Sequence, residues 1–298
     1  GIYKSSNVGV EWELIRNLEN SEGKLHAAPS GLYYFSQYKL YTSANSGDTW
    51  HEKSQLIPLF NSQTLYTTDE NLFVGLWGGG VVRTAIAGDG DWQLVNNGIA
   101  VHQVNDLTIS GSTIYAGLEN SFIRSSADEG QTWEQEKDTY NLFGVSGRAL
   151  FSTDAGLFVG SGGGGVQRSS DNGATWQLKN EGLISQNVLD FALAGTSIFV
   201  GADDGVYKST NNGDNWIKKT GEMAMLRTLH SDGTTVYAAT YDGLFQSSDV
   251  GENWTRISTG LPDESIGSIA HIGTVLYAAT QFNGLYKTTN SGESWENV

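Results

Sequence analysis

The chain has 298 residues, of which 38% are hydrophobic and 11% aromatic, enough for the core of one large domain or two small ones. Its formal charge is −16, and a surface this acidic repels phosphate groups, which argues against nucleic acid and anionic membranes as partners. There is no cysteine, which excludes disulfides and thiolate metal sites, and no apolar run approaches the roughly 20 residues that a membrane-spanning helix needs.

Eight of the nine tryptophans recur at a regular spacing along the chain. They are Trp12, Trp50, Trp92, Trp133, Trp176, Trp216, Trp254 and Trp295. A spacing of about 40 residues is typical of proteins in which each repeat forms one small sheet. The regular spacing therefore predicts a chain built from repeated units of one kind.

A short motif, Ser-x-Asp-x-Gly-x-Thr-Trp, precedes these tryptophans, as Ser126, Asp128, Gly130 and Thr132 precede Trp133. The Asp or Asn of the motif is Asn7, Asn45, Asp128, Asp171, Asn211, Asp249 or Asn290, and the copy before Trp92 is degenerate, with Ala85, Ala87 and Asp89 in place of Ser, Asp and Gly. Asp and Asn side chains accept hydrogen bonds from backbone amides two residues on, and glycine adopts positive φ at little cost. Because the motif recurs in every repeat, it predicts a structural turn and not a catalytic or calcium site.

Each repeat has the pattern of four short strands, illustrated by residues 188–193, 197–200, 206–209 and 215–218. Such repeats predict an all-β fold, a seven-bladed β-propeller of four-stranded antiparallel blades, as one domain over residues 1–298. Eight motif hairpins follow only seven inner strand pairs, so residues 1–14 are expected to form an extra or closing hairpin. The alternative is eight blades, one of them incomplete.

Loops between the second and third strands are the expected binding surface, because a rigid scaffold positions them. Trp77 is the one tryptophan outside the motif, and it precedes three glycines, so it is the first candidate for stacking on a sugar ring. The other candidate ligand-binding residues in these loops are Tyr38, Glu119, Asn120, Asp203, Asp204, Tyr241, Asp242 and Phe282.

Asp106 and Asp190 fall at equivalent positions of two inner strands and are the candidate catalytic residues if the chain is an enzyme. A pair of carboxylates is what glycoside hydrolysis requires. The histidines lack the spacing of metal ligands, and no glycine run has the pattern of a phosphate loop. We therefore expect neither a metal nor a cofactor.

The motif resembles the Asp-box, or bacterial neuraminidase repeat, and the resemblance extends over the whole chain. Propellers of this superfamily include sialidases, xyloglucan hydrolases, sortilin-like receptors and photosystem II assembly-factor-like proteins, the last being most similar in size and repeat density. Sialidases carry an Arg-Ile-Pro motif and an arginine triad, and this sequence has no Arg-Ile-Pro. Its Arg83, Arg124 and Arg168 are predicted to share one repeated position with Lys4, Lys208 and Lys287, which argues against a sialidase.

The sequence thus predicts a non-catalytic binding or scaffold propeller whose loop face binds a glycan or a protein. The alternative is a glycoside hydrolase-like enzyme that uses carboxylates of the inner strands. We expect a monomer that is extracellular or periplasmic, with a leader preceding Gly1, and that neither binds nucleic acid nor inserts into a membrane.

Overall fold

The structure, a computed structural model, describes residues 2–4, 13–16, 23–28, 31–36, 39–43, 49–52, 62–86, 91–99, 103–119, 123–135, 146–220, 223, 225–262, 265–272, 275–280, 283 and 285–297. It divides into two compact units, Gly1–Gly147 and Arg148–Val298. Every element of the described residues is a β-strand. In these residues there is no helix with the length and apolar character needed to cross a bilayer.

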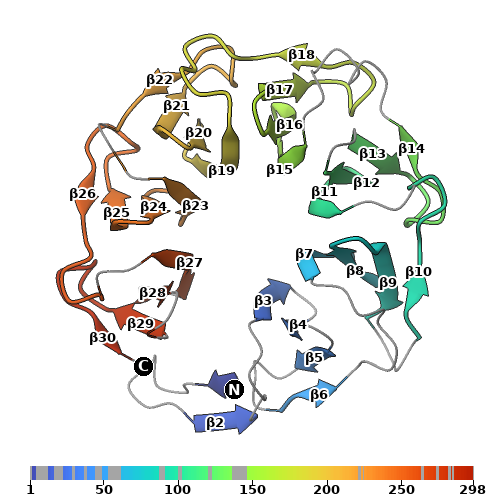
Figure 1. Ribbon diagram of the computed structural model, residues 1–298, viewed down its shortest axis with the longest axis horizontal. Coiled ribbons are helices and arrows are strands. Elements are labelled where there is room, and N and C mark those ends of the chain that lie inside the picture. The colour runs from blue at the N-terminus through green and yellow to red at the C-terminus, as the bar shows by residue number, and fades with distance from the viewer. Residues whose placement is uncertain are drawn as a thin grey trace. The chain divides into compact units, whose positions relative to one another are not determined.

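The first unit contains a two-stranded sheet and three four-stranded sheets (Figure 1). The two-stranded sheet pairs β1 (Ile2–Lys4) with β2 (Glu13–Arg16). The four-stranded sheets are β3 (Gly23–Ala28), β4 (Gly31–Ser36), β5 (Lys39–Ser43) and β6 (His51–Glu52); β7 (Ser62–Thr67), β8 (Asn71–Leu76), β9 (Gly80–Ala85) and β10 (Gln93–Leu94); and β11 (Val104–Ser110), β12 (Thr113–Leu118), β13 (Ile123–Ser126) and β14 (Glu134–Gln135).

The second unit contains four four-stranded sheets, the first of which begins at the unit boundary. They are β15 (Gly147–Thr153), β16 (Gly156–Ser161), β17 (Gly165–Ser169) and β18 (Gln177–Leu178); β19 (Val188–Ala194), β20 (Ser197–Ala202), β21 (Gly205–Ser209) and β22 (Ile217–Lys218); β23 (Leu226–Ser231), β24 (Val236–Thr240), β25 (Gly243–Ser247) and β26 (Thr255–Arg256); and β27 (Ile266–Ile272), β28 (Val275–Thr280), β29 (Leu285–Thr288) and β30 (Glu296–Asn297).

Seven sheets of four strands in sequence order, with antiparallel pairing throughout, confirm the predicted fold class, a seven-bladed β-propeller. In the described part of the chain β1 and β2, where an extra hairpin was predicted over residues 1–14, pair with each other alone and form a two-stranded sheet. First strands of several neighbouring sheets contact one another within a unit, as β7 contacts β11 and β19 contacts β23.

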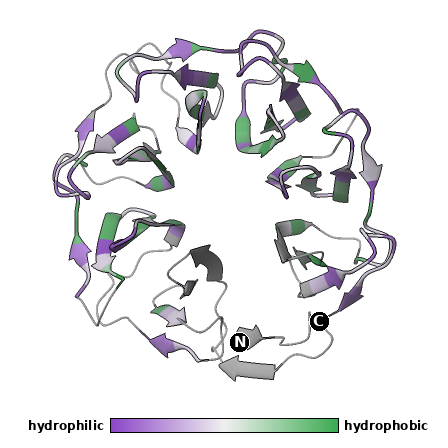
Figure 2. Cartoon of the chain, turned by 180° about the vertical axis from the view of Figure 1, so that it is seen from behind, coloured by the Kyte–Doolittle hydropathy of each residue, from purple (hydrophilic) through white to green (hydrophobic). Residues whose placement is uncertain are grey.

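The core lies between neighbouring sheets, where the second strands are buried on both faces. In β8, β12 and β16 every residue after the first is buried. Such strands are continuous apolar segments, whereas the two-residue fourth strands are mostly exposed. Figure 2 shows hydrophobic segments within the sheets and hydrophilic segments along the turns that connect strands.

Close contact between sheets requires glycine near the end of a second strand. A Cβ atom added to Gly160 in β16 would lie 2.3 Å from Cγ1 of Val188, the first residue of β19. The same substitution at Gly201 in β20 would place Cβ 2.1 Å from Cδ2 of Leu226 in β23. Carbon atoms in contact are normally about 3.5–4.0 Å apart, so a side chain at either position would require the neighbouring side chain to move.

The turn that carries the Ser-x-Asp-x-Gly-x-Thr-Trp motif, called the box for short, joins the third and fourth strands. In the turn after β13, the Ser126 hydroxyl donates to Asp128 Oδ1 (2.8 Å) and accepts from the Gly130 amide (2.8 Å). Asp128 Oδ1 also accepts from the Thr132 amide at 2.8 Å. The residues after the box Asp or Asn have positive φ, 59° at Glu129 and 80° at Gly130, which side-chain hydrogen bonds to this turn stabilise.

The same contacts recur in the other described boxes. Asp171 and Asp249 accept from the backbone amide four residues on, as do Asn211 and Asn290. Some box tryptophans also attach their sheet to the preceding repeat: Trp133 Nε1 donates to the carbonyl of Val95 at 2.7 Å, and Trp216 and Trp295 donate to the equivalent carbonyls. Asn7 and Asn45 lie outside the described residues.

Candidate binding surface at the loop ends of the sheets

Trp77 lies in the turn between β8 and β9 with 55% of its surface exposed. The side chain of Asn96 holds this turn: its Oδ1 accepts from the Val81 amide at 2.7 Å and its Nδ2 donates to the Gly79 carbonyl at 2.8 Å. Gly80 has a φ of 74°, and a Cβ atom there would lie 2.3 Å from the Asn96 amide group. The turn that carries the exposed indole is therefore fixed in place, as a stacking platform requires.

The same clamp holds two turns of the second unit. Asn180 accepts from the Val166 amide at 2.8 Å and donates to the Gly164 carbonyl at 3.0 Å. In the next sheet the Thr220 hydroxyl accepts from the Val206 amide at 2.9 Å. These three clamp residues were not predicted as part of the surface, although each lies four positions after a box tryptophan and this spacing is visible in the sequence.

Tyr241 occupies the corresponding turn between β24 and β25 and is 45% exposed. The Arg227 guanidinium donates to its hydroxyl at 3.0 Å and lies 5.0 Å from its ring centroid. The next residue, Asp242, has its amide bonded to the Thr240 hydroxyl at 3.1 Å, and its carbonyl accepts from Arg256. The structure thus presents a second aromatic side chain at a loop end, with a cation against its face.

The predicted acidic residues are tied to different local partners. Asp203 accepts from the Ser185 hydroxyl and from Asn187 Nδ2. Asp204 accepts from Lys218 at 2.9 Å and from the Tyr207 hydroxyl at 2.7 Å. Burial raises the pKa of Tyr207, and the hydrogen bond to Asp204 raises it further.

Glu119, in the first unit, accepts from Asn105 Nδ2 at 2.9 Å. Each described acidic side chain of these turns except that of Asp242 therefore has a neutral or cationic partner of its own. Tyr38, Asn120 and Phe282 lie outside the described residues.

Asp106 and Asp190 both bind donors on a neighbouring sheet. Asp106 Oδ1 accepts from the Thr64 hydroxyl of β7 at 3.1 Å. Asp190 Oδ2 accepts from the Thr228 hydroxyl at 2.7 Å and from the Leu229 amide at 2.8 Å, both in β23. Burial raises the pKa of Asp190, and these hydrogen bonds oppose the rise. The contacts give both carboxylates a role in joining adjacent sheets.

The cations before the boxes point to the box of the following sheet. Arg83 donates to the Glu129 carbonyl at 2.6 Å, Arg168 donates to the Asn212 carbonyl at 2.5 Å, and Lys208 binds Glu252 at 2.7 Å. These separate contacts do not converge on one ligand site.

The predicted equivalence of Arg124 with Arg83 and Arg168 is wrong by one residue. Arg83 pairs with Gln93 and Arg168 with Gln177, each the residue after a box tryptophan. In the β13–β14 pair, Ser125 and not Arg124 opposes the residue after Trp133, which is Glu134. Since side chains alternate across a strand, a shift of one places Arg124 on the other face of its sheet.

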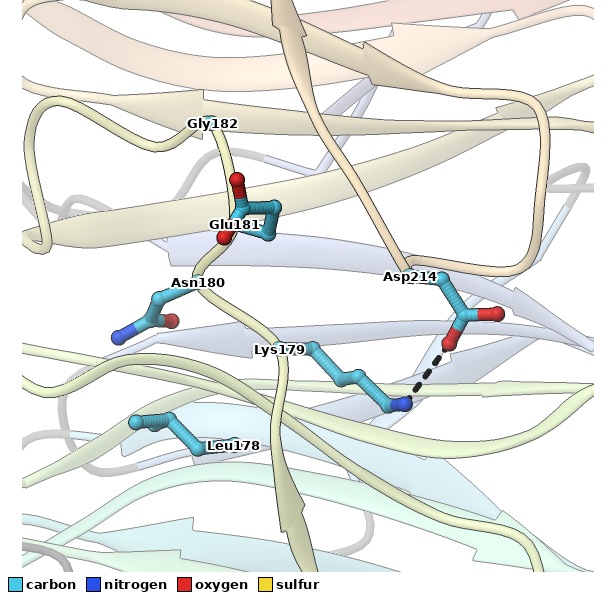
Figure 3. A pocket seen from close by; sticks show the side chains of 6 residues that line it. All are labelled: Leu178, Lys179, Asn180, Glu181, Gly182 and Asp214. Carbon is cyan, nitrogen blue, oxygen red and sulfur yellow. Dashed lines mark hydrogen bonds and ion pairs between the residues drawn. The ribbon is translucent and has the colours of Figure 1, made fainter.

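A shallow pocket of about 480 Å³ lies beside the fourth strand of the β15–β18 sheet. It is lined by Leu178, Lys179, Asn180, Glu181, Gly182 and Asp214 (Figure 3). Lys179 binds Asp214 at 2.7 Å, and this hydrogen bond lowers the pKa of Asp214. The ion pair and the Asn180 clamp occupy the polar groups of Lys179, Asp214 and Asn180, whose contacts hold together the chain segments around the pocket. Within the described part of the chain, no group of three or more His, Asp or Glu side chains is arranged to hold a metal ion.

Comparison with known proteins supports the fold. A family model, the DUF6242 beta propeller domain, matches residues 157–281. The extracellular domain of the putative one-component system BT4673 from B. thetaiotaomicron is 12% identical with a TM-score of 0.71, over 90% of this chain and 38% of that one. YCF48 bound to D1 peptide is 13% identical with a TM-score of 0.66, over 92% of this chain and 97% of that one.

PorZ, a surface component of the type-IX secretion system of Porphyromonas gingivalis, is 14% identical with a TM-score of 0.64, over 90% of this chain and 37% of that one. This chain therefore corresponds to about two fifths of the BT4673 and PorZ chains. At these identities the similarity establishes the β-propeller fold alone. No curated protein matches the sequence.

Proposed function

We propose that this chain is a non-catalytic, exported propeller of the Asp-box type whose loop ends bind a glycan or a protein. The observation that carries the proposal is the exposed indole of Trp77 on a turn fixed by Asn96. A buried core tryptophan would be expected at a repeated position, whereas Trp77 is outside the repeat and faces solvent. Exposed aromatic side chains held in place at low entropic cost are typical of recognition surfaces.

Export is proposed because two structural neighbours are an extracellular domain and a bacterial surface component. The absence of cysteine is compatible with several compartments. We further propose that residues 1–298 act as one monomeric domain without a cofactor.

The hydrolase alternative depends on Asp106 and Asp190. A raised pKa at Asp190 favours it, because a general acid must hold its proton near neutral pH. Binding is the better proposal because donors on the neighbouring sheets occupy both carboxylates. Hydrolysis of any β- or α-linked polysaccharide by the wild-type chain, abolished in Asp190→Asn with its fold retained, would reverse this preference.

The test of the binding proposal is a glycan array probed with the wild-type chain, Trp77→Ala and Leu178→Ala. Leu178 is the matched control, since it is 58% exposed on a fourth strand, away from the loop ends. We expect glycan binding that falls by about tenfold or more in Trp77→Ala, the scale of losing a central aromatic contact. Binding that is equal in all three chains would contradict the role of Trp77.

A further inference from the structure

The second unit contains two exposed arginines whose charge is not neutralised by a carboxylate contact. Six of its nine cations form ion pairs: Arg168, Lys179, Lys208, Lys218, Lys219 and Lys287. Arg256 donates to a hydroxyl and a carbonyl. Among the described residues, Arg148 and Arg227 differ from these seven cations in that each has a single hydrogen-bond partner, the neutral oxygen of Asn187 or of Tyr241, and no ion pair. In a chain of formal charge −16, carboxylates are abundant, so these two exceptions are informative.

The two arginines differ in what surrounds them. Arg148 donates to Asn187 Oδ1 at 2.9 Å, and Asn187 Nδ2 in turn donates to Asp203. Arg148 is therefore linked to a carboxylate through the side chain of Asn187. The contacts of Arg227 are the hydroxyl and the ring face of Tyr241. Its guanidinium has five N–H donors, and the Tyr241 bond uses one of them. The remaining donors can bind a carboxylate through two parallel hydrogen bonds.

Apolar surface adjoins Arg227. Tyr241 is 45% exposed and Met225 is 57% exposed, and the Tyr241 amide donates to the Met225 carbonyl at 3.2 Å. Arg227 lies at a break in the regular pairing of β23 with β24, between Leu226 and Thr228, and such bulges redirect a side chain at the end of a strand. Arginine, tyrosine and methionine are enriched at the centres of protein interfaces. A uronic acid could pair its carboxylate with Arg227 and stack its ring on Tyr241, but it has no apolar side chain that would pack on Met225.

We propose that Arg227, Tyr241 and Met225 form a docking site for an acidic peptide segment of a partner protein. A Glu or Asp carboxylate of the segment pairs with Arg227, and an adjacent apolar side chain packs on Tyr241 and Met225. The inference rests on the proposed binding function and names the partner class at one set of loops. It does not depend on Trp77, which lies in the other unit.

The experiment is selection of a randomised peptide library on the whole chain, followed by affinity measurements on the enriched peptides by fluorescence polarisation. We expect enriched peptides with Asp or Glu beside Leu, Ile, Phe or Met. Their affinity should fall about tenfold or more in Arg227→Ala and in Tyr241→Ala, and should decrease with added salt. Replacing the peptide carboxylate by its amide should give the same loss.

Arg148→Ala is the matched control, because it removes the same charge from the second residue of an equivalent strand. Arg148→Ala should change the affinity for the enriched peptides by less than twofold. A loss equal to that of Arg227→Ala would show that binding depends only on the net charge of the chain, and it would overturn the proposal. No enriched acidic peptide, or enriched peptides indifferent to Arg227, would also overturn it. So would Arg227-dependent binding of polygalacturonate without peptide enrichment, which would assign the site to carbohydrate. Trp77→Ala separates the two proposals: it should leave peptide affinity unchanged and reduce glycan binding.

Discussion

At the scale of single residues, the box aspartates are structural groups that ionise unusually easily. Hydrogen bonds from the Thr132 hydroxyl and amide lower the pKa of Asp128 to about 2, and equivalent bonds lower those of Asp171 and Asp249. A carboxyl with a folded-state pKa below its unfolded value of 3.8 stabilises the fold above that value. That contribution disappears as the pH falls from about 4 to about 2.

Asparagine occupies this position at Asn211 and Asn290, so the chain itself provides the neutral substitution. We expect Asp128→Asn, Asp171→Asn and Asp249→Asn together to flatten the loss of unfolding free energy between pH 4 and pH 2. Urea unfolding at several pH values measures this. The raised pKa of Asp190 acts in the opposite direction, because it favours the fold as the pH falls. Asp190 is present in both the wild-type chain and the triple variant, so its contribution cancels when the two are compared. An unchanged slope in the triple variant would show that the acid response arises elsewhere.

Asn96 provides a second residue-scale prediction, because it accepts from the buried Val81 amide. Asn96→Ala leaves that amide without its acceptor and should cost about 1–3 kcal/mol of unfolding free energy. The loosened turn should also expose the Trp77 indole further, so that a soluble quencher reduces its fluorescence more strongly. Asn97→Ala is the control, since this exposed side chain should contribute less than about 0.5 kcal/mol. Equal stability of both variants would mean that the clamp does not hold the turn.

At the scale of elements, the contact between adjacent sheets depends on glycines near the ends of the second strands. Glycine contributes nothing to a hydrophobic pattern, so the pattern does not reveal these contacts. Gly160→Ala should destabilise the second unit by about 1–3 kcal/mol, because its Cβ atom would overlap Val188. In the background of Val188→Ala the same substitution should cost less, because the shortest contact, with Val188 Cγ1, is removed while the contacts of 3.0 Å with Val188 Cβ and Phe191 Cε2 remain. A double-mutant cycle by thermal unfolding measures the coupling, and additive effects would show that the overlap is not the cause.

The sequence predicted strands better than registers. The short β-branched and aromatic runs located the second strands, such as Ile198–Val200 within β20, because these strands are buried on both faces. The fourth strand of the same repeat was expected over residues 215–218, but β22 contains only Ile217 and Lys218. Its shortness has a physical cause: the Trp216 amide bonds to the Glu181 carbonyl of the preceding sheet and not to its own sheet.

At the scale of the whole chain, the repeat alone determined the fold class, and Trp77 was identified because it breaks the repeat. The rest of the candidate surface was not predictable in this way. Arg227 of β23 contacts Tyr241 in the turn after β24, beside a break in strand pairing that recurs in other sheets, so the contact could be recognised only from the positions of the two side chains. The hydrogen bonds of Asp190 to β23 required the neighbouring sheet to be placed first.

The central claim is that the loop ends of the sheets bind a partner and the fourth strands do not. Its most direct test compares Trp77→Ala/Tyr241→Ala with Leu94→Ala/Leu178→Ala, two pairs of exposed apolar residues on loop ends and on fourth strands. Both variants are assayed on the same glycan array and the same selected peptides, with thermal unfolding as a check on folding. We predict that the loop-end variant loses binding to both ligand classes while the fourth-strand variant binds like wild type. Retained binding in the loop-end variant, or lost binding in the fourth-strand variant, would contradict the account.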